Sequence, residues 1–314
     1  MTAVIRQLGD RAAGIFLVLI VAFSPLCAFG GTIVRVSTSI GDFSIELLDE
    51  TAPITVQNFL NYVNRNDYNG TYFHRVVDDF VAQGGAYRFE LFVGPIDIPT
   101  DPPIQNEFTG QSNLRGTVAM ARIAEQPNSA TNQWFVNLQD NTDLDTVDGG
   151  FTVFGNVLGE GMQIVDALDD LPTIDLGLKA SDAPYWTTPY TDPRDFVFMN
   201  VEVVERLSGA PHVLETNSGL LITSVDIDNG SDLISMNFNS IPAGDEVVIQ
   251  ANLESVIRRR GPVEGVATFS TADTRLRIPT LEVNMNGNVI LVSNVVFALT
   301  NTSPVQFTLE SFQQ

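Results

Sequence analysis

Short runs of alternating apolar and polar residues, separated by glycine turns, recur along the chain after residue 31. Residues 33–38 and 43–47 each alternate with a period of two, and Gly41 lies between them. Successive side chains of a β-strand point to opposite faces, so this period places the apolar set of each run on one face. The two runs therefore predict a β-hairpin with one buried face.

Two segments have the spacing of an amphipathic helix. Pro53, a residue favoured in the first helical turn, precedes Val56, Phe59 and Val63, and residues 161–168 carry their apolar side chains on one face. Further strands are predicted over residues 72–77, 81–83, 116–121, 133–138, 151–157 and 196–207. The proline-rich segment 172–195 interrupts this order, and we expect its aromatic residues to cover the core rather than to bind a ligand.

The composition changes after Ser208-Gly209-Ala210-Pro211. Residues 212–314 contain many strand-like runs, and Asn286-Gly287-Asn288 between two of them is typical of a tight hairpin. About one hundred residues are enough for an independent core. We therefore predict three parts: a leader over 1–30, a mainly β domain over 31–207, and an all-β, sandwich-like domain over 208–314.

The first 30 residues have the order of a secretory signal. Two arginines precede an apolar run over residues 12–23, Pro25 follows this run, and small residues come next. The run is shorter than the about 20 residues that span a bilayer. We expect cleavage after Gly30 or after Ala28, which leaves a mature chain without a membrane span; an uncleaved anchor is the alternative.

Composition excludes several classes of function. The chain has 16 basic and 38 acidic residues and a net charge of −22, which argues against binding to nucleic acid. Cys27 is the only cysteine, so an intrachain disulfide and a cysteine zinc site are excluded. His74 and His212 are the only histidines, which excludes a multi-histidine metal centre. We expect neither a cofactor nor a metal.

One acidic segment, residues 226–232, has the oxygen ligands that calcium prefers. Its glycine is one position early for an EF-hand loop, and Asp228-Asn229-Gly230 is equally typical of a hairpin turn. We interpret the segment as a turn and keep a calcium site as the alternative.

The densest polar and aromatic stretch is residues 72–85. On one continuous strand Phe73 and Arg75 would share a face and His74 would point the other way. Arg75 and Gln83 stand among apolar residues without a nucleophile beside them, which favours binding of a peptide carbonyl or amide. A structural ion pair of Arg75 with Asp78 or Asp79 is the alternative interpretation.

Five motifs in order resemble the cyclophilin family of peptidyl-prolyl isomerases over about residues 33–207. They are 52–59 (Ala-Pro-Ile-Thr-Val-Gln-Asn-Phe), 73–85 with Phe-His-Arg-Val-Val and Phe-Val-Ala-Gln-Gly-Gly, 116–122 (Gly-Thr-Val-Ala-Met-Ala-Arg), 129–136 (Ser-Ala-Thr-Asn-Gln-Trp-Phe-Val), and 144 with 151–157 (Phe-Thr-Val-Phe-Gly-Asn-Val). The resemblance implies an eight-stranded antiparallel β-barrel closed by two helices, with a site on its outer surface.

The resemblance also assigns roles to residues at the matching positions. It implies that Arg75 is catalytic and that Gln83 holds the substrate backbone. The substrate-binding residues it implies are Phe80, Val81, Phe135, Leu144 and Phe151 around the proline, Ala121 and Arg122 along the groove, the latter mainly through its backbone, and Gln133 as a polar aid. Val81 stands where the family often has methionine, and Phe151 where it has a histidine. Asp143 stands where many eukaryotic members have the tryptophan that contacts cyclosporin.

These observations give two hypotheses of different kinds. The first is a cofactor-free isomerase that acts on X–Pro bonds of exported proteins, in the periplasm or the medium of a bacterium. An arginine suits this reaction because it stays charged and can stabilise the prolyl nitrogen as amide resonance is lost. The second is a non-catalytic peptide-binding chaperone or scaffold that uses the same groove. In either case the partners are proline-containing polypeptides, and residues 208–314 would contact an envelope component or a protein.

Overall fold

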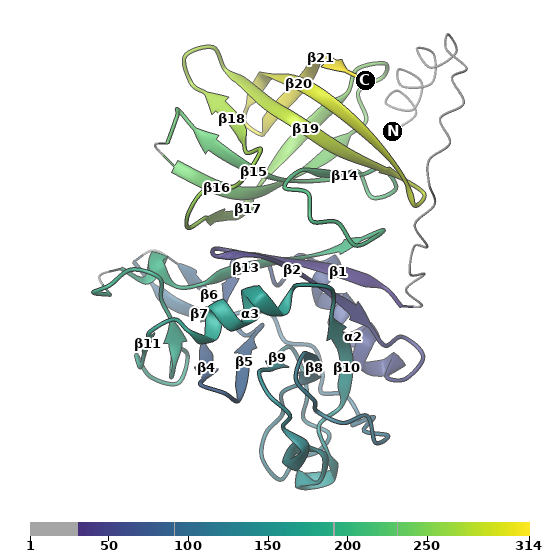
Figure 1. Cartoon of the computed structure of the whole chain (residues 1–314), viewed down its shortest axis with the longest axis vertical. Helices are drawn as coiled ribbons and strands as arrows, with labels where there is room; N and C mark the ends of the chain where they lie inside the picture. The colour runs from purple at the N-terminus through teal and green to yellow at the C-terminus, as the bar shows by residue number, and fades with distance from the viewer. Residues whose placement is uncertain (1–30, 91, 191, 231) are drawn as a thin grey trace. The chain divides into compact units, whose positions relative to one another are not determined.

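The computed structural model describes residues 31–90, 92–190, 192–230 and 232–314 (Figure 1). The predicted leader over residues 1–30 lies outside the described residues. The described chain divides into two compact units, one formed by residues 31–209 with 257–261 and the other by residues 210–256 with 262–314. Among the described residues, no helix is both long and apolar enough to cross a membrane.

The first unit is mainly β, as predicted. Its strands are β1 (Ile33–Thr38), β2 (Gly41–Leu47), β3 (Thr71–Tyr72), β4 (Arg75–Val77), β5 (Val81–Gly84), β6 (Tyr87–Glu90), β7 (Gly94–Asp97), β8 (Thr117–Met120), β9 (Trp134–Asn137), β10 (Val153–Val157), β11 (Thr173–Ile174), β12 (Ala183–Pro184) and β13 (Phe198–Val204). Its helices are α2 (Pro53–Asn64), α3 (Met162–Asp169) and the short 3₁₀ turns η1 (Thr142–Asp145), η2 (Val147–Gly149) and η3 (Pro193–Asp195).

One sheet in the order β4-β5-β9-β8-β10-β2-β1-β13-β3-β6-β7 forms the barrel. Strands β3 and β4 lie far apart in this order although only residues 73 and 74 separate them along the chain. The segment 71–77 therefore links one end of the sheet to the other and closes it. Counted with this segment as one bent strand, eight strands surround the core, and β6 and β7 form an additional hairpin.

The break at residues 73–74 corrects one expectation. A single strand over 72–77 was predicted, with Phe73 and Arg75 on one face. The structure has two strands, and Phe73 is buried in the barrel core whereas Arg75 is partly exposed on β4. The irregular step between the strands removes the strict alternation, because the period of two holds only along continuous strand.

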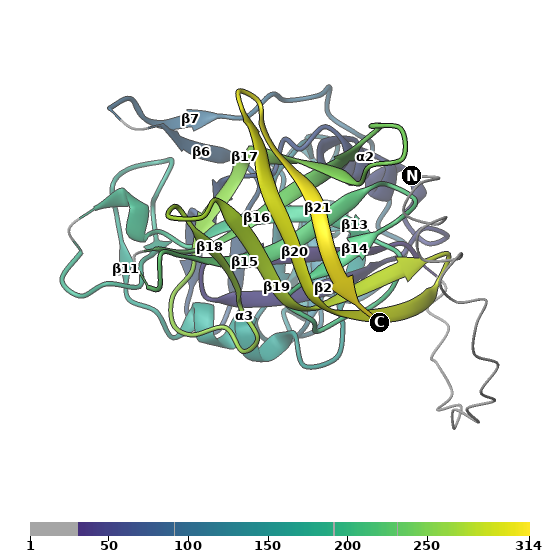
Figure 2. The ribbon, with the colours of Figure 1, turned by 90° about the horizontal axis from the view of Figure 1, so that it is seen from above.

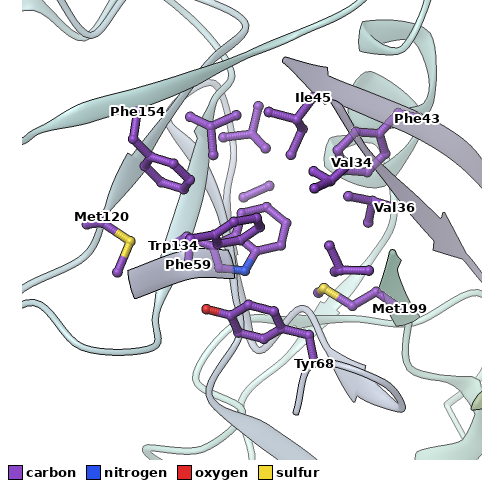
Figure 3. Packing of buried hydrophobic residues seen from close by; sticks show 14 of the residues in the cluster. Val34, Val36, Phe43, Ile45, Phe59, Tyr68, Met120, Trp134, Phe154 and Met199 are labelled. Atoms are coloured by element: carbon purple, nitrogen blue, oxygen red, sulfur yellow. The ribbon is translucent and has the colours of Figure 1, made fainter. Parts of the chain in front are cut away.

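The two helices cover the barrel core. Buried residues of α2, including Phe59, and of α3, including Val165, belong to the same cluster as the inward side chains of the strands. Phe59 meets Trp134 edge to face at a centroid distance of 6.0 Å (Figure 3). The carboxylate of Glu107 accepts hydrogen bonds from the backbone N–H groups of Ile54 (3.1 Å) and Thr55 (2.7 Å), which caps the N-terminus of α2 from a distant loop.

The segment 172–195 packs its aromatic side chains against a smaller cluster, as expected for a cover. Tyr190 stacks on Phe196 at 5.6 Å, and Phe196 stacks on Tyr72 at 5.1 Å. Tyr185 packs against the same cluster. These rings therefore shield the outer side of β3 and the region around Phe196.

The second unit contains only strands and turns in its described residues. They are β14 (Val213–Glu215), β15 (Leu220–Ile227), β16 (Asp232–Ile241), β17 (Val248–Arg258), β18 (Ala267–Ser270), β19 (Arg275–Met285), β20 (Asn288–Thr302) and β21 (Val305–Gln313). The predicted Asn286-Gly287 turn joins β19 and β20 in a hairpin, with Met285 opposite Asn288 (Figure 2). Both turn residues have positive φ, as a tight hairpin of two residues requires.

The sheet of this unit closes into a barrel, a difference from the two sheets of a sandwich. In addition to the order β14-β15-β16-β17-β21-β20-β19-β18, β14 pairs with β19 and β15 pairs with β18. Strand β19 takes part in this closure and contains Pro279, which can donate no ladder hydrogen bond. Residues of β19 before Pro279 pair with β18 and residues after it pair with β14. Strand β19 therefore pairs with both terminal strands of the sheet order.

In the acidic segment, Asp226 lies near the end of β15 and Asp228 lies in the turn over residues 228–230. Oδ1 of Asp226 accepts a hydrogen bond from the backbone N–H of Gly230 (2.5 Å). The carboxylate of Asp228 accepts from the backbone N–H and the hydroxyl of Thr271, both at 2.8 Å. The carboxylates thus have local partners, which is the interpretation the sequence favoured.

Gly85 follows the strand that carries Gln83 and is tightly packed in the left-handed region. Its φ is +84°, and a Cβ there would lie 2.7 Å from the carbonyl oxygen of Asn132 and 2.8 Å from the ring of Trp134. We expect Gly85→Ala to lower the free energy of unfolding by more than about 3 kcal/mol, because left-handed strain and overpacking act together. Gly110→Ala is the matched control: its φ is +97° but no atom lies within 4 Å of the added Cβ, so strain alone should cost about 1–2 kcal/mol. Urea unfolding of both variants measures the difference, and equal losses would contradict the packing argument.

Candidate active site

Five residues on five neighbouring strands stand opposite one another in register. They are Arg75 on β4, Gln83 on β5, Phe135 on β9, Ala119 on β8 and Val153 on β10. Residues directly opposite in a sheet project to the same face, about 4.8 Å from one strand to the next. We call this set the site row: a charged group stands at one end and an apolar surface at the other.

The site row faces away from the barrel core. The residues that alternate with it along the strands, such as Trp134, Val136 and Val118, belong to the core cluster. Phe135 and Ala119 instead belong to a separate cluster. The period of two therefore divides these strands into a core face and a site face.

Two hydrogen bonds link Arg75, Gln83 and Gln133 at the polar end of the site row. Nη1 of Arg75 donates to Oε1 of Gln83 at 3.4 Å, and Nε2 of Gln83 donates to Oε1 of Gln133 at 2.8 Å. The bond to Gln133 sets the orientation of the Gln83 amide, so that its oxygen is turned toward the guanidinium. In the part of the chain that the structure describes, Arg75 forms no ion pair, and Asp78 and Asp79 are exposed. The interpretation of Arg75 as a structural ion-pair partner therefore has no support.

The apolar end of the row is a cluster with buried and half-buried members. Val81, Ala119, Phe135 and Val153 are buried, and Leu48, Phe80, Ala121, Leu144 and Phe151 pack against them. The structure thus brings together all six apolar residues that the sequence pointed to. Sequence analysis missed Leu48, Ala119 and Val153; the alternation over 116–121 places Ala119 on the same face as Ala121 and could have indicated it.

Buried side-chain amides hold the loop that carries Leu144 and Phe151. Nδ2 of Asn141 donates to the backbone oxygen of Phe80 at 2.8 Å. Nδ2 of Asn113 donates to the backbone oxygen of Phe151 at 3.2 Å, and the backbone N–H of Phe151 donates to the backbone oxygen of Leu144 at 3.0 Å. Asp143 in the same loop is exposed and outside the apolar cluster.

Ala121 and Arg122 continue the chain beyond β8. The backbone N–H of Ala121 donates to the oxygen of Gln133 at 2.9 Å, which places both beside the site row. Arg122 is partly exposed as a residue, but its side chain is only 2% exposed. Its exposed surface is therefore its backbone, as the assigned role requires.

His74 lies behind the polar end of the row. Its side chain is buried, and its ring meets that of Tyr87 edge to face at 4.9 Å. Burial, together with the positive charge of Arg75, lowers the pKa of His74 from 6.5 to about 4, although a hydrogen bond with Gln133 acts in the opposite direction. A neutral imidazole is a packing residue here, in agreement with the structural role the sequence favoured.

Comparison with known proteins assigns the first unit to a class. Residues 33–185 match the family described as cyclophilin type peptidyl-prolyl cis-trans isomerase/CLD. Peptidyl-prolyl cis-trans isomerase A of Dickeya dadantii is 37% identical over 199 residues, which cover 97% of that protein and 62% of this chain. The isomerase of Acinetobacter baylyi is 42% identical over 154 residues, 79% of its length and 48% of this chain. A solved cyclophilin of Cryptosporidium parvum covers 56% of the chain and 99% of its own, with 21% identity and a TM-score of 0.43.

The β-barrel that carries the site row is thus of the cyclophilin type. The chain belongs to the cyclophilin-type peptidyl-prolyl cis-trans isomerase family. It is an enzyme of that class, which decides against the non-catalytic alternative.

The low pKa of His74 predicts a pH dependence of stability. Between about pH 6.5 and pH 4 the unfolded chain binds a proton at this residue and the folded chain does not. The contribution of His74 to the free energy of unfolding should therefore be complete above pH 6.5. It should be lost as the pH is lowered to 4, a loss on the order of 3 kcal/mol for this group. In His74→Phe the fall should be smaller by that amount. Urea unfolding at pH 7 and 4.5 measures it, with His212 present in both proteins; identical slopes would contradict the prediction.

Proposed function

We propose that the first unit isomerises X–Pro bonds of exported polypeptides, with Arg75 as the catalytic residue and no cofactor. The observation that carries the proposal is the site row, which aligns the Arg75 guanidinium with the apolar cluster around Phe135. Two strand spacings, about 10 Å, separate the backbones of these residues. An arginine side chain extended along the row reaches toward a proline ring bound at Phe135.

The reaction needs the amide to twist, not a bond to break. Resonance gives the X–Pro bond a barrier of about 20 kcal/mol, and the prolyl nitrogen regains its lone pair when the bond is twisted. In this mechanism the Arg75 guanidinium donates to that nitrogen, an interaction that the planar ground state offers only weakly. Gln83 and the exposed backbone of Arg122 hold the flanking peptide groups. Catalysis then follows from stronger binding of the twisted state than of either planar isomer.

The apolar cluster supplies binding rather than chemistry. Phe80, Val81, Phe135, Leu144 and Phe151 offer an apolar wall for the proline ring, and Gln133 keeps the Gln83 amide oriented. Because cis and trans proline bury similar area in such a wall, its contribution falls on substrate affinity. Proline-containing polypeptides are therefore the substrates we propose.

Arg75→Ala tests the catalytic assignment. We expect kcat/KM for cis-to-trans exchange of a short Ala–Pro peptide, measured by NMR, to fall at least 100-fold, in line with the loss of one preorganised charged donor. Arg75→Lys should recover little, because a lysine lacks the planar fork. Arg194→Ala, in an exposed arginine of the same unit, is the control and should match wild type. Full activity in Arg75→Ala would remove Arg75 from the mechanism.

We also propose export to the periplasm or medium of a bacterium, supported by the order of basic, apolar and small residues over 1–30. The full chain expressed in a bacterium should yield an extracytoplasmic product that begins near Gly31, as read by mass spectrometry of its N-terminus. Arg6 and Arg11 both replaced by glutamate should retain the chain in the cytoplasm. An intact Met1 on exported protein would exclude cleavage.

A further inference from the structure

The side chain of Arg122 is buried, whereas its backbone is exposed beside the site. The residue follows β8 at the edge of the site, yet its side chain is only 2% exposed and turns away from solvent. Such burial of a guanidinium has a desolvation cost that must be offset by specific contacts.

Those contacts join a ring and a turn. Cζ of Arg122 lies 4.1 Å from the centroid of the Phe151 ring, a close cation–π geometry. Nη2 donates to the backbone oxygen of Val147 at 2.7 Å and is 3.4 Å from that of Gly150. Nη1 is 3.9 Å from Oδ2 of Asp148. The guanidinium therefore fastens the turn 147–150 and covers a face of the next side chain.

Phe151 connects this arginine to the apolar cluster. Its ring meets that of Phe135 at 5.9 Å with an interplanar angle of 70°. It packs in the cluster with Phe135, Val81 and Ala119. The Phe151 ring thus lies in contact with the Arg122 guanidinium and with Phe135 of the site row.

A direct contact of the guanidinium with substrate is disfavoured, because the Arg122 side chain is only 2% exposed and the cavity beside it is small. The cavity beside it, lined among others by Met120, Asn106 and Thr152, measures about 10 Å³. That volume is about one water molecule and is too small for a substrate side chain. Nε and Nη1 of Arg122 are buried and form no hydrogen bond within the described residues, so the guanidinium is held by the ring and the turn carbonyls.

We propose that Arg122 is a positioning residue for the isomerase: its side chain holds Phe151 in place as a wall of the pocket that receives the substrate proline. The inference rests on the proposed function of that pocket. It assigns to the side chain a role beyond the backbone contact that the family resemblance implies. Because a pocket wall touches the substrate in both isomers, its displacement should weaken binding and leave the chemical step at Arg75 nearly unchanged.

Arg122→Met is the main test, because methionine keeps a long unbranched side chain and removes the charge and the donor fork. We expect KM for the Ala–Pro peptide to rise about 10-fold with kcat within 3-fold of wild type. In a Phe151→Ala background the same change should add less than 2-fold to KM, because the ring through which Arg122 acts is gone. Arg122→Lys should restore KM only in part, because an ammonium group cannot both stack on the Phe151 ring and donate from a planar fork to the turn carbonyls.

Arg88→Met is the matched control. Arg88 also ties a turn through Nη2, to the backbone oxygens of Asn66 (2.8 Å) and Asp67 (3.2 Å), and also has a buried Nε without a hydrogen bond in the described chain. It is absent from the site cluster, so its loss should leave KM unchanged at similar cost in stability.

If Arg122→Met does not fold, Phe151→Tyr and Phe151→Leu replace it: tyrosine keeps the aromatic face and should retain KM, whereas leucine should raise it as Arg122→Met would. Additive effects of Arg122→Met and Phe151→Ala, a fall in kcat at constant KM, or equal KM in the tyrosine and leucine variants would overturn the inference while leaving the isomerase function intact. A wild type without exchange activity would overturn the proposed function and the inference together.

Discussion

The register of five strands is the constraint on which the site depends. Arg75, Gln83, Phe135, Ala119 and Val153 are opposite one another across the outer face of the barrel. A shift of one residue in any of these strands would turn its member of the row into the core. The core residues between them, above all the fully buried Trp134, resist that shift because their inward side chains would have to face solvent. The same strand register is therefore required both for a stable core and for the geometry of the site.

Much of this arrangement could be predicted from local pattern. The period of two along 33–47 and the helical spacing after Pro53 give the hairpin and α2, because each depends on residues close in sequence. The six apolar site residues came instead from the family resemblance that the ordered motifs carry, and the structure brings them into one cluster. Ala119 was missed although its alternation with Ala121 indicates its face, and Val153 was missed because a β-branched residue on a strand carries no chemical signal of its own until the register shows what stands opposite.

The closure of each sheet by strands far apart in the sequence could not be predicted. The step at Phe73 and His74, which lets one segment join both ends of the first sheet, has no signature in a period of two. In the second unit the strand pattern is equally consistent with two sheets or one closed sheet. The pairing of β19 decides between them: its residues before Pro279 pair with β18 and its residues after Pro279 pair with β14. A proline within an apolar run was visible in the sequence, but the pairing of the residues after it with β14, a strand far away along the chain, was not.

The polar end and the apolar end of the site are held in place in different ways. This difference affects how substrate binding can change without a change at Arg75. Arg75 and Gln83 stand on paired strands, whose positions the ladder fixes. Leu144 and Phe151 stand on a loop without a ladder, and hydrogen bonds of side chains to backbone take its place. A loop held in this way needs a support for each ring it presents to the site. In the proposed mechanism, binding specificity can therefore change by exchange of a ring and its support together, as with Phe151 and Arg122, while the Arg75 guanidinium stays where the sheet holds it.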